Sequence, residues 1–231
     1  MTRPPKTQRI ASVRQVNIDI LSAQGWIIVR HGGSSSHILS LAQSLGRVIT
    51  PPNRPTLHRL KATAMLDAVR NSYSGRFGYG QFPFHTDMAN WTTPPRYVLL
   101  RHYAGDSSIP TLLLDSQLLL SRVGREKVKH GIWSARARHR SFVLNLLSDR
   151  KKLPLFRWDP CTLVPLSEEA KEATDIIFEE IERQREKNSV PISFDPEAIL
   201  VIDNWRTLHA RPAIPIQSQN RELERVLVSG N

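Results

Sequence analysis

The chain has 231 residues, of which 40% are hydrophobic and 23% charged, an ordinary composition for a globular protein. At this length one sizeable core is expected, and we predict a single domain over residues 1–231. No apolar run reaches membrane-spanning length, and no signal-peptide-like apolar segment follows the basic N-terminus MTRPPKTQRI. The single cysteine, Cys161, excludes an internal disulfide and is typical of the reducing cytoplasm, where we expect the protein.

A formal net charge of +11 is the one unusual bulk property. A basic surface concentrates anions, so it favours acidic small molecules, nucleic acid or anionic lipid without choosing among them. Residues 122–140 carry seven Lys and Arg residues against one Glu. We interpret this run as a solvated loop or strand edge; the alternative is an electropositive rim that attracts an anionic substrate.

In the N-terminal half, residues 16–25 are predicted as a short amphipathic element, followed by a buried strand over 26–29 that ends at a Gly-Gly pair. The serines at 34–36 can cap a helix, whose apolar stripe would be Leu39, Leu41, Ala42 and Leu45. Three prolines at 51, 52 and 55 mark a loop. Residues 60–84 have the pattern of strand and turn.

In the C-terminal half, 97–103 and 111–114 are strand candidates. The clearest helix spans 167–187, with Ser167 as N-cap and two glutamates suited to the positive end of the helix dipole. Residues 198–203 and 225–230 are the last strand candidates. Many short strands with only two convincing helices favour a barrel or sandwich over a βαβ fold, so we predict a mainly β fold with flanking helices.

His85 and Asp87 stand one residue apart in the segment FPFHTDM. Side chains at positions i and i+2 of a strand point to the same face, roughly 7 Å apart at the base. Both could lean toward one metal ion, and a second histidine would complete the two-His, one-carboxylate set of non-haem Fe(II) oxygenases. Alone, the pair is also typical of ordinary solvated residues at a strand end.

The segment 200–230 supplies the remaining candidates. His209 follows an apolar strand candidate and could return to the face of His85 and Asp87. Arg221 and Arg225 come next, and their even separation of four residues places them on one face of a strand. A guanidinium there could reach a carboxylate of a bound ligand.

Together these residues resemble a known family. His85-x-Asp87, then His209, then Arg221-x-x-x-Arg225 is similar to the pattern of the taurine dioxygenase and clavaminate synthase-like Fe(II)/2-oxoglutarate-dependent dioxygenases. The segments SIPTLLLDS (108–116), FRWDP (156–160) and DNWRTLHAR (203–211) also resemble pieces of that family. The resemblance covers residues 16–228, nearly the whole chain.

The resemblance implies a metal and co-substrate site. His85, Asp87 and His209 would bind Fe(II), which 2-oxoglutarate would chelate through its 2-oxo group and one carboxylate. The far carboxylate would pair with Arg221, helped by the hydroxyl of Thr111. A guanidinium suits a carboxylate because two parallel charge-assisted hydrogen bonds form at once.

For the substrate, the resemblance leaves alternatives open. Arg225 could contact either 2-oxoglutarate or an acidic group of the substrate. Trp91 could line the substrate pocket, and a buried core position is the equal alternative. The implied substrate is a small molecule, anionic or amino-acid-like.

The implied reaction uses O2 to oxidise an unactivated C–H bond, with release of succinate and CO2. Hydroxylation is the default outcome, desaturation or cyclisation also occurs in the family, and the presence of Asp87 argues against halogenation. The implied fold is a double-stranded β-helix, the cupin-like jelly roll. Residues 1–15 would be a poorly ordered arm and residues 117–155 a lid or insert.

Two other functions stay open from the sequence. A nucleic-acid-acting 2-oxoglutarate oxygenase would account for the charge of +11, but that branch spaces its arginines more widely, so nucleic acid is not the partner we expect. A non-catalytic cupin-like binding domain would carry the three motifs by coincidence. The other six histidines match no ligand motif and are interpreted as surface or structural residues: His31, His37, His58, His102, His130 and His139.

Overall fold

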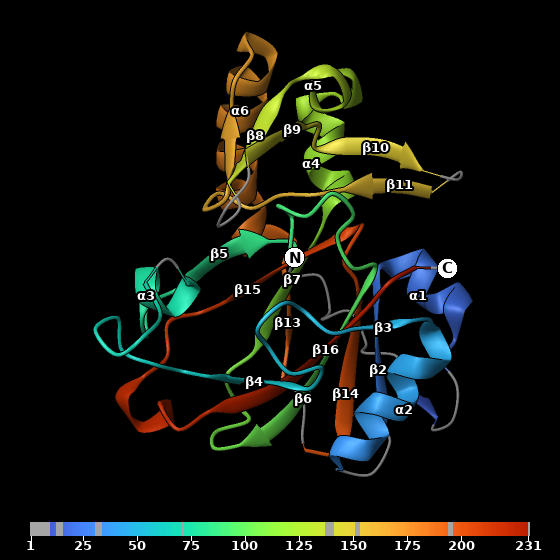
Figure 1. The fold of residues 1–231 in the computed structure, drawn as a ribbon, viewed down its shortest axis with the longest axis vertical. Coiled ribbons are helices and arrows are strands. Elements are labelled where there is room, and N and C mark those ends of the chain that lie inside the picture. Colours follow the sequence, from blue (N-terminus) through green and yellow to red (C-terminus); the bar gives the residue numbers. More distant parts are fainter. Residues whose placement is uncertain are drawn as a thin grey trace, which may run out of the picture.

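The fold is that of a computed structural model, which describes residues 10–12, 16–30, 34–70, 72–136, 141–150, 153–193 and 196–230. Two larger sheets lie at its centre (Figure 1). The seven-stranded sheet contains β1 (Ile10–Ser12), β2 (Trp26–Arg30), β14 (Ala198–Asp203), β6 (Tyr97–Ala104), β16 (Glu222–Val228), β3 (Val48–Ile49) and β4 (His58–Lys61). The four-stranded sheet contains β13 (Val190–Ile192), β7 (Thr111–Asp115), β15 (Thr207–Arg211) and β5 (Phe82–His85).

An apolar core lies between these two sheets. Alternate residues of β2, β6, β14 and β16 face inward and form one buried cluster with Leu113 of β7 and Ile192 of β13. Because side chains alternate across a strand, the residues between them face outward on each sheet. The inner faces of β5, β15 and β16 therefore point toward the space that the two sheets share.

Helices cover the outer face of the seven-stranded sheet. They are α1 (Ile18–Gln24) and α2 (Ser35–Leu45), whose Leu21, Ile38 and Leu41 are buried against outward-facing residues of β2, β6, β14 and β16. The Asn17 side chain caps α1 by accepting from the amide of Ile20. Burial of an apolar stripe, more than helix propensity, stabilises such short helices.

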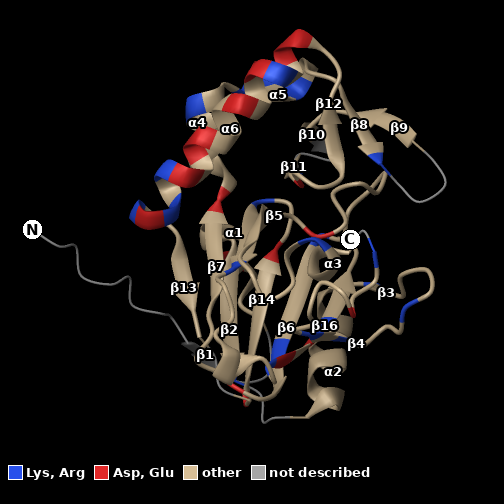
Figure 2. Ribbon diagram, turned by 90° about the vertical axis from the view of Figure 1, so that its left-hand side faces the viewer, with Lys and Arg blue, Asp and Glu red and all other residues tan. Residues whose placement is uncertain are grey.

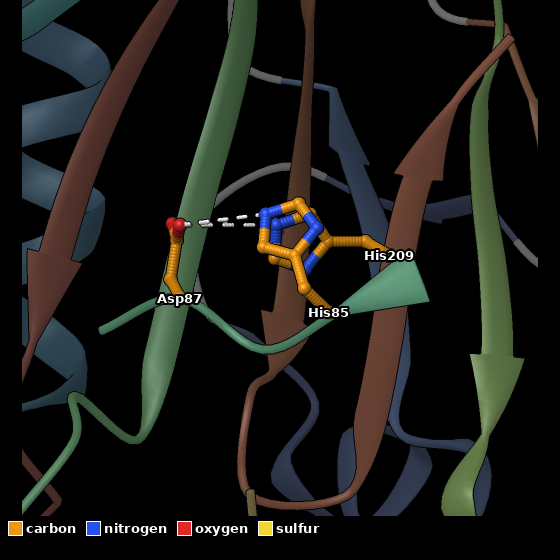
Figure 3. A group of neighbouring side chains, drawn as sticks. All are labelled: His85, Asp87 and His209. Atoms are coloured by element: carbon orange, nitrogen blue, oxygen red, sulfur yellow. Dashed lines mark ion pairs between the residues drawn. The ribbon is translucent and has the colours of Figure 1, made fainter. Parts of the chain in front are cut away.

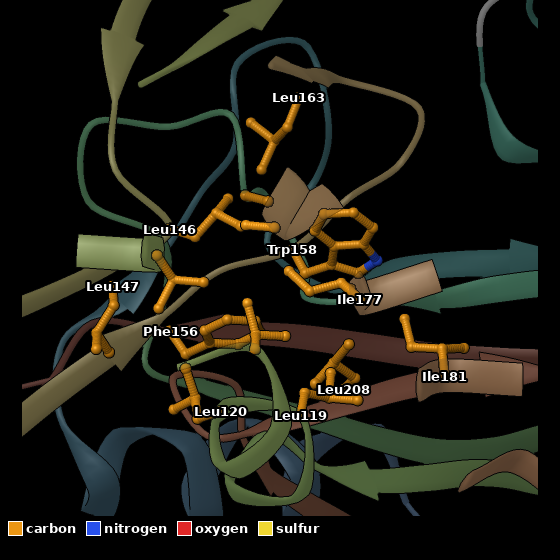
Figure 4. Packing of buried hydrophobic residues seen from close by; sticks show 14 of the residues in the cluster. Leu119, Leu120, Leu146, Leu147, Phe156, Trp158, Leu163, Ile177, Ile181 and Leu208 are labelled. Atoms are coloured by element: carbon orange, nitrogen blue, oxygen red, sulfur yellow. The ribbon is translucent and has the colours of Figure 1, made fainter. Parts of the chain in front are cut away.

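The outer face of the four-stranded sheet is covered by residues 116–187 (Figures 1 and 4). Ile177 and Ile181 of the long helix pack with Trp158, Phe156 and outward-facing residues of β5, β7 and β15. The covering elements are α4 (Ser116–Val123), α5 (Arg125–His130), β8 (Trp133–Arg136), β9 (Ser141–Leu144), β10 (Leu147–Arg150), β11 (Leu153–Phe156), β12 (Leu163–Pro165) and α6 (Glu168–Lys187).

The prediction of a mainly β fold with flanking helices is confirmed in part, because the structure is a mixed α/β fold with several antiparallel sheets. The structure adds α1, α3 (Tyr73–Phe77), α4 and α5 to the two helices expected, since helices of five to eight residues are too short to show a period. The last strand is Glu222–Val228 instead of 225–230, so Arg221 precedes it. Among the described residues no strand pairing joins the two larger sheets into a closed barrel.

Parts of the predicted arm and insert lie outside the described residues, namely 1–9, 13–15, 137–140 and 151–152. Within the arm, Ile10–Ser12 pairs in parallel with β2. The basic run 122–140 was predicted as a solvated loop or strand edge, but its described part, 122–136, contains α5 and β8, and β8 is the middle strand of its sheet. Lys127 forms a 2.6 Å ion pair with Glu172 of α6. Basic and acidic residues intermingle on α4–α6 (Figure 2). No helix in the described ranges is both long enough and apolar enough to cross a membrane.

We predict that Ile177→Ala lowers the free energy of unfolding by about 2–4 kcal/mol, because Ile177 is fully buried in the cluster beneath α6 and its loss leaves a cavity. Chemical denaturation would measure the change. Ile216→Ala is the matched control, since that side chain is 85% exposed and its removal should change stability by less than about 0.5 kcal/mol. Equal effects of both substitutions would contradict the assigned core.

Candidate metal centre

The two candidate histidines lie on neighbouring strands of the four-stranded sheet. His209 of β15 is the register partner of His85 at the end of β5. The residues beside them, Phe84, Leu208 and Ala210, face outward into the α6 cluster. Alternation therefore turns both imidazoles to the inner face, toward the seven-stranded sheet.

Asp87 joins the two histidines from the turn that follows β5 (Figure 3). Its Oδ1 lies 4.0 Å from Nε2 of His85 and 3.9 Å from Nε2 of His209. One ligand atom from each side chain falls within 4.8 Å of the other two. With metal–ligand bonds of about 2 Å, the ligand atoms of a facial set lie about 3 Å apart, so these side chains need to move together by only about 1 Å to hold an ion.

The His85 ring is held from two sides. Its Nδ1 lies 2.9 Å from the carbonyl oxygen of Pro83, which fixes the proton on Nδ1 and leaves the Nε2 lone pair facing Asp87. The ring of Tyr73 stacks on it at a centroid distance of 4.4 Å. The Tyr73 hydroxyl donates a 2.8 Å hydrogen bond to Asp159, which anchors the ring.

The Asp87 backbone is fixed by one buried carboxamide. Asn204, fully buried after β14, accepts from the Asp87 amide at 2.7 Å and donates to the Asp87 carbonyl at 3.0 Å. It also donates to the carbonyl of Pro95 at 2.9 Å. On the other side of the turn, Thr86 donates its amide to the Trp158 carbonyl and accepts from the Trp158 amide. Asp87 therefore has little freedom to leave the centre.

The FRWDP segment holds the chain beyond Asp87. Arg157, 4% exposed, donates to the carbonyl oxygens of Ala89, Trp91 and Thr92. These carbonyls belong to no helix or strand, so without the guanidinium each would lose a hydrogen-bond donor. The role of this motif is thus to shape the turn that carries a candidate ligand.

Arg225 is the charged neighbour of the centre. It lies on the inner face of β16, and its Nη1 is 2.9 Å from Oδ1 and 3.0 Å from Oδ2 of Asp87. Burial raises the pKa of the Asp87 carboxyl, but Arg225 and the two histidines outweigh burial and hold that pKa below its usual value. Burial and the adjacent His85 lower the pKa of His209 to about 3. The donor set thus combines a neutral His209 imidazole and an ionised Asp87 carboxylate with the His85 imidazole.

These donors fit a divalent transition metal. Two imidazole nitrogens and one carboxylate oxygen on one side of an ion make a facial set that leaves three positions open, the arrangement of non-haem Fe(II) oxygenases. The three ligand atoms lie within 4.8 Å of one another, and among the described residues Arg225 is the only cation that hydrogen-bonds to one of these side chains.

The remaining predicted site residues are Arg221, Thr111 and Trp91. Arg221 is 7% exposed, has no side-chain hydrogen bond within the described ranges, and burial lowers its pKa to about 10 while Asp106 opposes the shift. Thr111 of β7 is buried and shares the inner face with Leu113. Trp91 is partly buried, and its described hydrogen bonds are through its backbone. None of the three has a hydrogen bond, ion pair or ring contact with His85, Asp87 or His209 in the described part of the chain.

Sequence reasoning missed several residues around the centre. Tyr73 and His58 gave no signal, because α3 and β4 are too short for the sequence to show which face a side chain takes. Asn204 appears in the sequence analysis only within the segment DNWRTLHAR (203–211). His102, interpreted as a surface or structural residue, is 4% exposed on the inner face of β6, and His58 lies 3.4 Å from Arg225.

Comparisons with known proteins agree with this geometry at the level of fold. No protein-family model and no curated protein matches the chain. Among solved structures, an asparagine oxygenase in complex with Fe(II), 2S,3S-3-hydroxyasparagine and succinate has a TM-score of 0.72 and 16% identity, over 92% of this chain and 78% of that chain.

Two other structures are similar. The non-heme iron oxygenase OrfP in complex with Fe, succinate and (3S)-hydroxy-L-Arg has a TM-score of 0.68 and 16% identity, over 93% of this chain and 77% of that chain. The PvcB protein of Pseudomonas aeruginosa has a TM-score of 0.65 and 15% identity, over 91% of this chain and 78% of that chain. This chain therefore shares its fold with non-haem iron oxygenases, and it carries a His-Asp-His triad within that fold.

We predict that Asn204→Ala weakens binding of a divalent metal by about tenfold or more, because the Asp87 backbone loses both hydrogen bonds that fix it. Anaerobic titration with Fe(II), or with Co(II) as a coloured substitute, would measure the affinity. Asn145→Ala is the matched control: that carboxamide donates to the Gly131 carbonyl, and its loss should leave metal affinity unchanged. Unchanged affinity in folded Asn204→Ala would contradict the positioning role.

Proposed function

We propose that the protein is an Fe(II)- and 2-oxoglutarate-dependent oxygenase. The observation that carries the proposal is the clustering of partly buried His85 with buried Asp87 and His209, within a fold shared with iron oxygenases. OrfP has also been solved in complex with Fe and alpha-ketoglutaric acid, so the shared fold accommodates this co-substrate in a relative. We describe the two facing sheets as the double-stranded β-helix, or jelly roll, of such enzymes.

In this proposal the three ligands hold Fe(II), which when bound activates O2 at the expense of 2-oxoglutarate and releases succinate and CO2. Arg221 binds the far carboxylate of 2-oxoglutarate, with the Thr111 hydroxyl beside it. Support comes from the burial of Arg221 without a side-chain hydrogen bond among the described residues, since a buried guanidinium is stabilised by a carboxylate partner.

The proposed substrate is a small anionic or amino-acid-like molecule, and hydroxylation of an unactivated C–H bond is the proposed outcome. The structures of the asparagine oxygenase and OrfP contain hydroxylated asparagine and hydroxylated arginine, which supports an amino-acid-like scaffold. Arg225 would bind the substrate's acidic group and Trp91 would line its pocket. We further propose one oxygenase domain over residues 1–231, with 117–155 as its insert, acting in the cytoplasm, where iron stays reduced.

We predict that His85→Ala and Asp87→Ala each abolish 2-oxoglutarate-dependent succinate formation, because two ligands hold Fe(II) far less tightly than three. Succinate formed with Fe(II), 2-oxoglutarate and O2 would be quantified, together with metal content. His130→Ala is the control, since that side chain is 68% exposed on α5 and should keep full activity. Undiminished succinate formation in both His85→Ala and Asp87→Ala would contradict the proposed function.

We predict that Arg221→Gln weakens 2-oxoglutarate binding by about tenfold to a hundredfold, the loss expected for a charge-assisted hydrogen-bond pair. Anaerobic titration of the Fe(II)-loaded protein with 2-oxoglutarate, followed through its weak visible charge-transfer band, would measure the affinity. Arg122→Gln removes the same charge on α4 and should leave the affinity as it is. If Arg221→Gln binds 2-oxoglutarate as tightly as the wild type, Arg221 does not hold its carboxylate.

A further inference from the structure

His102 of β6 lies one strand step away from the candidate metal centre, in the space between the two larger sheets. On β16, Arg225 contacts Asp87 and is the register partner of Leu100. The next inward-facing pair along these two strands is Leu223 with His102. Leu100 and Leu223 both belong to the cluster between the sheets, so alternation turns His102 to the same inner face. Residues two apart on one face of a strand are separated by about 7 Å.

Thr111 occupies the same level on the four-stranded sheet. His209 is the register partner of Leu113, and Thr111 is the inward-facing residue two positions before Leu113 on β7. β6 ends and β7 begins at the same end of the fold, where residues 105–110 join them (Figure 1). His102 and Thr111 therefore lie in one layer of the interior, about one strand step from the layer of the metal ligands.

Arg221 belongs to this layer as well. It immediately precedes β16, and its backbone nitrogen lies so close to Gly105 that a Cβ on this glycine would be 2.7 Å away from it. The charge of Arg221 lowers the pKa of His102 and the pKa of Arg211 at the end of β15. Asp106, in the loop after β6, is a carboxylate that acts on Arg221. The two guanidiniums and the imidazole therefore share one end of the interior.

The imidazole of His102 is buried without a partner. His102 is 4% exposed, and neither of its ring nitrogens makes a hydrogen bond with a described residue. The inward-facing residues of β14 and β4 at this level, Ala198 and Leu60, are apolar. Arg221 is 7% exposed and also lacks a side-chain hydrogen bond within the described ranges. Because burial of unpaired polar groups is unfavourable, the two neighbouring donors point to one anionic oxygen group as their common partner.

The surroundings of His102 decide when its ring carries a proton. Burial, then Arg221 and, less strongly, Arg101 lower the pKa of His102. The backbone carbonyls of Gly105 and Asp106 raise this pKa, and a carboxylate beside the ring would raise it further. Between these carbonyls and a carboxylate the ring meets acceptors for two donors, which only the protonated imidazole provides.

We propose that His102 is a further 2-oxoglutarate-binding residue, which takes up a proton on binding and donates a hydrogen bond to the far carboxylate. The inference rests on the proposed function, and it adds a titratable partner to Arg221 and Thr111. A dicarboxylate chelated at the metal centre reaches His102 because the two layers are separated by one strand step, about 7 Å.

A pH dependence of co-substrate binding follows from this role of His102. Its pKa is lowered in the protein without 2-oxoglutarate and is raised when the carboxylate binds. The affinity for 2-oxoglutarate therefore rises as the pH falls through the higher pKa of the complex, and it levels off below the lower pKa of the free protein. Above both values His102 stays neutral and contributes no pH dependence.

The test is a calorimetric titration of the Mn(II)-loaded protein with 2-oxoglutarate, in two buffers of different ionisation enthalpy, which counts the protons taken up. For the wild type we expect uptake of up to about one proton at about pH 6 and little at about pH 8, the range around histidine titration. His102→Gln keeps a donor but does not titrate, so its proton uptake should be the same at both pH values. His130→Gln is the matched control, because that side chain is 68% exposed on α5, and it should behave as the wild type.

A second variant removes the donor itself. His102→Leu should weaken 2-oxoglutarate binding about tenfold at about pH 6, the loss of one charge-assisted hydrogen bond. Thermal unfolding shows whether each variant is folded, and the proton uptake of the wild type needs no variant. Equal uptake at both pH values in the wild type, or the same uptake in the wild type and folded His102→Gln, would overturn the role of His102 and leave the proposed function standing. Absence of 2-oxoglutarate binding to the wild type would overturn the proposed function, and this inference with it.

Discussion

The register of β15 against β5 is the constraint on which the centre depends. Pairing of His209 with His85 sets both imidazoles on the inner face, and a slip by one residue would turn one of them into the apolar cluster beneath α6. That cluster fixes the register, because Phe84, Leu208 and Ala210 each bury their side chains on the outer face. The hydrophobic core of one layer thus determines the geometry of the polar site in the next. No interaction between the two histidines themselves is needed to bring them together.

The third ligand is fixed in another way, because Asp87 lies beyond the end of its strand. Met88, with a positive φ of 55°, takes the chain out of the strand direction, so no sheet ladder can hold the turn. Asn204 and the Thr86–Trp158 pairing replace that ladder with side-chain and backbone hydrogen bonds from two other segments. A buried network of this kind stabilises only when all its members are satisfied, and Asn204 uses both its oxygen and its nitrogen. The segments FRWDP (156–160) and DNWRTLHAR (203–211) therefore hold the turn that carries Asp87 in place.

The sequence predicted the triad of His85, Asp87 and His209, but not the residues that hold the triad in place. The strands at 26–30, 97–104, 111–115 and 198–203 and the helix at 168–187 were visible because burial on one or both faces leaves a pattern in the chain. The short helices α4 and α5 were not predicted, since their few apolar residues fit a strand as well as a helix. Asn204, Tyr73 and His58 act through contacts with residues distant in sequence, for which a single chain carries no local signal.

Arg225 contacts both the candidate metal ligand Asp87 and His58 on β4. Its Nη1 pairs with Asp87 and its Nη2 faces His58. Burial of a guanidinium costs free energy unless it is paired, and Asp87 supplies that pairing only until a divalent ion shares the carboxylate. The ion then leaves Arg225 and His58 with an excess of positive charge and of donors. Metal binding and binding of the proposed acidic substrate beside Arg225 should therefore favour each other.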